Sequence, residues 1–178
     1  MLRRDDTVCV MVDFQVRLLA AIHGSDAIVA NAIKLARGMR ALGMPIEWTE
    51  QNPRGLGPTV PELAELLPGE PIVKLSFSCC REPSFAEVIA RLDRNQIVLA
   101  GIETHVCVWQ TASHLLAAGR EVHIVADAVS SRTPQNRDIG IERARDAGAA
   151  ITSVETALFE LLGVAEGPTF KEILKIVK

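Results

Sequence analysis

Two kinds of hydrophobic pattern alternate along the chain. Short runs that are apolar at nearly every position, such as 7–12 and 96–100, are typical of strands that are covered on both faces. Longer segments repeat apolar residues every three or four positions, which predicts helices. We expect strands over 7–12, 45–49, 71–74, 96–100, 121–126 and 149–153. We expect helices over 26–42, 60–67, 84–92, 108–116, 134–148, 154–162 and 168–178, and a loop over 51–58.

Strands and helices that alternate in this way indicate the α/β class. Strands without a polar face favour a parallel sheet with helices on both sides, a three-layer α/β/α sandwich. Neither an internal repeat nor an interdomain linker is visible, so we expect one domain over residues 1–178. In an open parallel sheet a ligand site lies at the carboxyl ends of the strands, and the search for chemistry begins there.

Composition narrows the range of functions. Of the 178 residues 48% are hydrophobic and 23% charged, which is typical of a globular protein. The net charge of −3 and the lack of a long basic run weigh against nucleic acid as the main partner. The apolar runs are too short for a membrane span, and the first residues do not resemble a signal peptide. The four cysteines include no C-x-x-C pair, so we expect a reduced, cytoplasmic protein without disulfides.

One cysteine follows a predicted strand and precedes a predicted helix. With Thr104 as a helix N-cap, Cys107 would lie in the first helical turn. The positive end of the helix dipole favours a thiolate there, and free backbone N–H groups can receive an oxyanion. The alternative is that Cys107 is a small buried side chain at a helix start.

Two further reactive residues fall at carboxyl ends of strands. Asp13 follows the first strand and Lys74 ends the third. Cys107 would attack an electrophilic carbon, Asp13 would take its proton and return one to the leaving group, and Lys74 would keep Asp13 ionised. Each residue has an alternative interpretation, because an aspartate that ends a strand is often a turn residue. A lysine at a strand end is usually solvated. His105 and His114 are poorly placed as the base, because one lies on another helix face and the other two turns away.

Two weaker motifs carry little weight. Gly55-Leu56-Gly57 resembles the start of a dinucleotide fingerprint but lacks its third glycine and its position after a strand. Cys79-Cys80 is an adjacent pair near the expected site, most simply explained by packing, with a redox role as the alternative.

Four ordered motifs together resemble the isochorismatase-like cysteine hydrolases. They are Val12-Asp13-Phe14-Gln15, Val73-Lys74 with Ser76-Phe77-Ser78, the stretch 101–107 and the stretch 126–132. The stretch 49–63 is similar to the branch called isochorismatase domain-containing proteins. The resemblance implies a six-stranded parallel sheet of order 3-2-1-4-5-6 and a catalytic triad of Asp13, Lys74 and Cys107. It also implies a cis peptide bond between Ile102 and Glu103, with the N–H groups of Glu103 and Cys107 forming an oxyanion hole.

The family's branches bear on the reaction. Nicotinamidases carry an Asp-x-His metal motif after the second strand, whereas this chain has Glu50-Gln51-Asn52 and no histidine there. True isochorismatases lack the cysteine. The resemblance therefore implies a hydrolase without metal or cofactor, which cleaves a C–N bond of a small amide or ureido substrate through an acyl group on Cys107. We expect the substrate pocket to be lined by Phe14, Gln15, Gln51, Phe77 and Trp109.

Assembly and two alternatives complete the expectations. The mean hydropathy of +0.21, the apolar positions of the C-terminal helix and the resemblance favour a homo-oligomer in which that helix makes contacts. The helix contributes Phe170, Ile173, Leu174 and Val177. One alternative is a non-catalytic oligomeric binding or scaffold protein of the same fold, and the other is a thiol redox protein that pairs Cys107 with Cys79 or Cys80.

Overall fold

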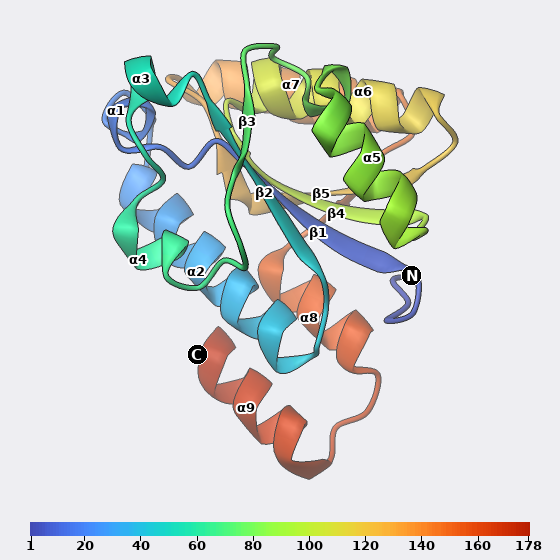
Figure 1. Cartoon of the computed structure of the whole chain (residues 1–178). Helices are drawn as coiled ribbons and strands as arrows, with labels where there is room; N and C mark the ends of the chain where they lie inside the picture. Colours follow the sequence, from blue (N-terminus) through green and yellow to red (C-terminus); the bar gives the residue numbers. More distant parts are fainter.

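A computed structural model describes all residues, 1–178, and contains one six-stranded sheet (Figure 1). Every strand pair is parallel and the order is β3-β2-β1-β4-β5-β6, which confirms the expected architecture. The strands are β1 (Thr7–Val12), β2 (Ile46–Gln51), β3 (Ile72–Lys74), β4 (Gln96–Ile102), β5 (Glu121–Ser130) and β6 (Ala150–Thr152). Every residue of β1 and β4 is buried, as their unbroken apolar runs predict.

Helices cover both faces of the sheet (Figure 1). One face carries α2 (Ser25–Ala41) and α8 (Val154–Leu162), with α4 (Pro61–Ala64) against α2 and α9 (Gly167–Val177) against both α2 and α8. The other carries α5 (Pro83–Leu92), α6 (Trp109–Ala117) and α7 (Pro134–Asp146). Short segments complete the chain: α1 (Val16–Leu19), α3 (Pro53–Leu56), a 3-10 turn η1 (Cys79–Arg81) and a π-helical turn η2 (Thr104–Val108). No helix combines the length and the apolar character that crossing a membrane requires.

The C-terminal helix buries its apolar face within its own chain. Ile173 is fully buried, and Phe170, Ile176 and Val177 pack against the core on the α2 side. The Lys34 Nζ donates a hydrogen bond to the Val177 carbonyl oxygen at 3.0 Å, which ties α9 to α2. Most of the face that we expected to contact other subunits therefore stabilises the fold of a single chain.

Three local predictions need correction. The expected loop over 51–58 contains α3, which Pro53 begins in the first-turn position that tolerates proline. The expected helix over 60–67 is reduced to α4. β5 continues to Ser130, four residues beyond the predicted end, because a register shift opposite Leu99 and Gly101 lets it follow β4 to its last residue.

Candidate active site

A glycine at the end of β4 allows the two central strands to approach closely. Gly101 pairs with Val12 and has a φ of 136°, in the region that favours glycine. A Cβ at this position would lie 2.2 Å from the Val12 carbonyl oxygen. The carboxyl ends of β1 and β4 therefore meet without an intervening side chain, and Asp13 lies beside the stretch that leads to Cys107.

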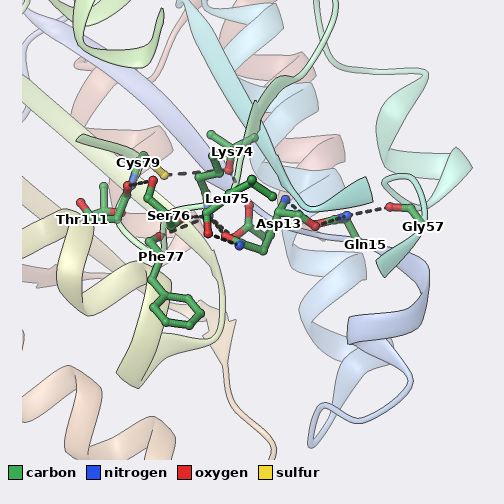
Figure 2. A network of polar contacts seen from close by, with 12 residues as sticks. Asp13, Gln15, Gly57, Lys74, Leu75, Ser76, Phe77, Cys79 and Thr111 are labelled. Atoms are coloured by element: carbon green, nitrogen blue, oxygen red, sulfur yellow. Dashed lines mark hydrogen bonds and ion pairs between the residues drawn. The ribbon is translucent and has the colours of Figure 1, made fainter. Parts of the chain in front are cut away.

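Asp13, the predicted proton acceptor, and Lys74, its predicted cation, form a buried ion pair. Lys74 ends β3, which is separated from β1 by β2, and its Nζ lies 2.6 Å from Asp13 Oδ2 (Figure 2). Both side chains are completely shielded from solvent. Thr49, at the carboxyl half of β2, donates from its hydroxyl to the other carboxylate oxygen, Asp13 Oδ1, at 2.7 Å. The sheet order thus brings Lys74 back to Asp13, as the sequence predicts.

Lys74 has further oxygen partners that fix its position. Its Nζ donates to Gln51 Oε1 at 2.8 Å and to the carbonyl oxygens of Ser76 and Phe77 at 3.4 and 3.2 Å. Burial by itself would lower the pKa of Lys74, but the negative charge of Asp13 prevails and the pKa is raised. The raised pKa favours the ammonium form of Lys74. Gln51, in the region where nicotinamidases carry a metal motif, accepts one of its hydrogen bonds.

Cys107 lies in a π-helical turn and not in the first turn of an α-helix. The turn spans Thr104–Val108 and follows Glu103, whose carbonyl oxygen accepts from the N–H groups of Val106 and Val108. Thr104 does not act as an N-cap, because its hydroxyl is buried without any hydrogen-bond partner. The expected local geometry around Cys107 was therefore wrong in detail, although the cysteine does precede α6.

The electrostatic environment also differs from the expected one. Burial raises the pKa of the Cys107 thiol well above its usual range, and the charge of Asp13 raises it further. Lys74 lowers the pKa but does not reverse the shift. The prediction that Cys107 rests as a stabilised thiolate is therefore wrong. The site holds a neutral thiol beside a carboxylate, and this carboxylate is the group able to take its proton.

The backbone before the turn has the geometry that the resemblance implies. The Ile102–Glu103 peptide bond is cis. The N–H of Glu103 has no acceptor within the chain. The Glu103 side chain is held by Arg132, which donates to its Oε2 from the backbone N at 3.1 Å and from Nε at 3.0 Å. Glu103 is thus fixed through its side chain, while its N–H stays available.

Two of the expected pocket residues belong to the frame of the site. Phe14 is 1% exposed and packs in the core. Gln15 is fully buried, and its Nε2 donates to the carbonyl oxygens of Gln51 and Gly57 while its Oε1 accepts from the Gln51 N–H (Figure 2). Because burial and backbone contacts engage both side chains, we no longer regard Phe14 and Gln15 as pocket residues.

The remaining three occupy different positions around the ion pair. Gln51 contacts Lys74 directly. Phe77 contributes its carbonyl oxygen to Lys74, while the residue is 55% exposed and its ring points away from the ion pair in Figure 2. Trp109 is half-buried in the first turn of α6, with the guanidinium of Arg143 4.5 Å from the centre of its ring.

One contributor to the site, Thr49, was missed in the sequence, and a second, Cys79, was expected near the site but given only a packing or redox role. Thr49 touches Asp13, and Cys79 contacts Thr49 through its sulfur at 3.9 Å. Thr49 pairs with Val12 across the sheet, so a polar residue at the end of a strand next to Asp13 was an available signal. Cys79 follows β3 through an irregular segment, and no periodic pattern indicates that it turns inward.

Comparisons with known proteins agree with this architecture. The model of the isochorismatase domain matches residues 7–156. Isochorismatase domain-containing protein 2 of Danio rerio is 41% identical over 172 residues, which cover 96% of this chain and 86% of that protein. The MAR1 ribonuclease structure from Caenorhabditis elegans has a TM-score of 0.92 at 34% identity, covering 99% of this chain and 91% of the other. The YcaC structure from Escherichia coli, described as an octameric hydrolase of unknown specificity, has a TM-score of 0.93 at 24% identity and covers 98% and 88%. This chain belongs to the isochorismatase family.

Proposed function

We propose that this protein hydrolyses a C–N bond in a small amide or ureido compound through an acyl group carried on Cys107. The observation that carries the proposal is the buried Lys74–Asp13 ion pair at 2.6 Å, next to a thiol whose pKa Asp13 raises. A buried charge pair is costly to maintain and contributes little net stability. Its presence beside a nucleophile favours a role in proton transfer.

The proposed reaction begins with transfer of the Cys107 proton to Asp13. The sulfur attacks the carbonyl carbon, and the negative oxygen of the tetrahedral intermediate is held by the N–H groups of Glu103 and Cys107. Asp13 then gives its proton to the leaving nitrogen, the C–N bond breaks and an amine or ammonia departs. A water molecule, deprotonated by Asp13, attacks the thioester, and the acid is released with the thiol restored.

Lys74 has an electrostatic role in this scheme. Its ammonium partly neutralises the charge of Asp13, which would otherwise oppose the formation of a thiolate. Because all its contacts are to oxygens of the protein, Lys74 holds Asp13 in place and is not proposed to contact the substrate.

A small substrate is favoured over RNA, although one structural neighbour is described as a ribonuclease. Phosphate backbones are recognised by arrays of basic side chains. This chain has a net charge of −3, and the lysine of its site is buried and occupied by protein oxygens. The observations on this chain thus favour a neutral acyl compound.

The test is hydrolysis of a panel of small amides and ureido compounds by wild type, Cys107→Ala and Cys80→Ala. We expect Cys107→Ala to lose at least about a thousandfold in rate, because no other group replaces the nucleophile. Cys80 lies outside the ion-pair network and its variant should retain activity. Mass spectrometry of quenched reactions should show the acyl group on the Cys107 peptide. Hydrolysis that survives in Cys107→Ala would refute Cys107 as the nucleophile, and a wild-type protein that hydrolyses none of the compounds would favour the non-catalytic alternative.

We also propose that the chain forms a homo-oligomer. Three exposed apolar residues lie in the edge strand β3 and the segment that follows it, alternating with more buried residues: Val73, Leu75 and Phe77, which are 51%, 75% and 55% exposed. Exposed apolar side chains gathered on a free edge are typical of a contact surface. The octameric state of the Escherichia coli neighbour is compatible with this proposal.

A further inference from the structure

The base of the proposed reaction is held at both of its oxygens. Lys74 Nζ occupies one lone pair of Asp13 Oδ2 at 2.6 Å, and the Thr49 hydroxyl occupies one lone pair of Oδ1 at 2.7 Å. A carboxylate oxygen can accept two hydrogen bonds. Each oxygen therefore keeps one free position for the proton of Cys107, and the orientation of the carboxylate decides where that position lies.

Thr49 is linked to Asp13 by its backbone as well as its side chain. The Asp13 N–H donates to the Thr49 carbonyl oxygen at 3.2 Å, and Thr49 is 1% exposed. Asp13 itself has a φ of 58°, which is uncommon for a residue with a side chain. The two contacts with Thr49 fix both the backbone and the carboxylate of this residue.

Cys79 sets the direction of the Thr49 hydroxyl. Burial raises the pKa of Cys79 to about 12, so it is a neutral thiol at physiological pH. Its S–H can donate to Thr49 Oγ1, 3.9 Å away. The Thr49 proton is then directed to Asp13, and the three residues form a chain of donors that ends on the carboxylate.

We propose that Thr49 is a positioning residue for the reaction, whose hydroxyl holds Asp13 Oδ1 so that the carboxylate presents a free lone pair to the Cys107 thiol. The inference rests on the proposed function for its meaning, but the contact acts on Cys107 whether or not a substrate is present. The same donor also offsets part of the negative charge of Asp13, and this charge is what disfavours the Cys107 thiolate.

The experiment measures the rate at which iodoacetamide alkylates Cys107 at pH 8 to 10, read by mass spectrometry of the Cys107 peptide. Thr49→Val keeps the shape of the side chain and removes the donor. With less of the Asp13 charge offset, fewer thiols ionise, and we expect labelling about fivefold slower. Thr49→Ser restores the hydroxyl and should restore the rate. If Thr49→Val does not fold, Thr49→Ala serves in its place.

A double variant separates positioning from a general structural effect. In an Asp13→Asn background the carboxylate charge is absent, so Thr49→Val should no longer change the rate of labelling. An equal rate in wild type and Thr49→Val, or an undiminished effect in the Asp13→Asn background, would overturn the proposal. Because labelling needs no turnover, a protein that hydrolyses none of the amides would refute the proposed function and still leave this result readable.

Discussion

The two ends of the central strands bury polar groups in different ways. At the amino end, Gln96 is fully buried and bonds to the Thr7 hydroxyl, to Glu121 and to the Met1 carbonyl oxygen. At the carboxyl end, Asp13 and Lys74 are equally buried but charged. The amino end satisfies an amide with ordinary hydrogen bonds, and it needs no function to explain it. The carboxyl end concentrates charge where the fold gains little stability from it, which is the physical sign of a reactive site.

The largest expected effect tests this contrast directly. Lys74→Met leaves Asp13 as a buried charge without its cation, and we expect the free energy of unfolding to fall by about 4 kcal/mol. Gln96→Leu at the amino end leaves partners unpaired but no buried lone charge, and should cost about 2 kcal/mol. Urea unfolding measures both. The double variant Asp13→Asn with Lys74→Met should recover most of the stability without activity. Equal losses in the two single variants would remove the distinction between the ends.

The space around the backbone also differs between the two ends of the sheet, here compared at Gly101 and Gly148. A Cβ at Gly101 would meet the Val12 carbonyl oxygen at 2.2 Å, whereas one at Gly148, just before β6, would meet nothing within 4 Å. Both have positive φ values, 136° and 105°. Gly148→Ala should therefore cost about 1 kcal/mol through its backbone conformation alone. Gly101→Ala adds the clash and should cost about 3 kcal/mol in thermal or urea unfolding. A smaller loss at Gly101 than at Gly148 would mean that the strand ends separate easily.

Two buried cysteines allow the effect of the Asp13 charge on a nearby thiol to be measured. Burial alone raises the pKa of Cys9, in the middle of β1, to about 12. Burial and Asp13 together raise the pKa of Cys107. Asp13→Asn removes the second cause, lowers the pKa of Cys107 and should speed its alkylation at pH 9 by about tenfold. Cys9 should show no change. Faster labelling of both thiols would indicate a loosened fold and would not support an electrostatic effect.

The sequence predicted the frame of this site better than its electrostatics. Unbroken apolar runs placed β1 and β4 within the sheet, and the ends of those runs identified Asp13 and the segment of Cys107. The end of the third predicted strand identified Lys74. The pKa of Cys107 could not be predicted, because it depends on burial and on the distance to Asp13, and both follow from tertiary packing.

The hydrophobic pattern also could not predict the conformation of short segments. The π-helical turn at 104–108 is too short to show a period, and its form depends on contacts with Glu103 and α7. A Cβ on Gly140 of α7 would lie 2.7 Å from the backbone of this turn, so a residue far away in the sequence helps to define it. Contacts of this kind leave no periodic signal in the local sequence.

The smallest expected effect on stability concerns the surface next to the carboxyl end. Leu75 is 75% exposed in the edge segment, and its carbonyl oxygen accepts from Gln51 Nε2 at 2.7 Å, so the segment is held in place while the side chain faces outward. Leu75→Asp should change the free energy of unfolding of one subunit by less than about 0.5 kcal/mol.

If this surface joins subunits, the buried charge should shift light scattering at micromolar concentration from an oligomer to a monomer. Val164→Asp is the matched control, because Val164 is 60% exposed on the connection between α8 and α9, away from the edge strand. A wild-type monomer would contradict the oligomer itself, and an oligomer that persists in Leu75→Asp would place the contact on another surface.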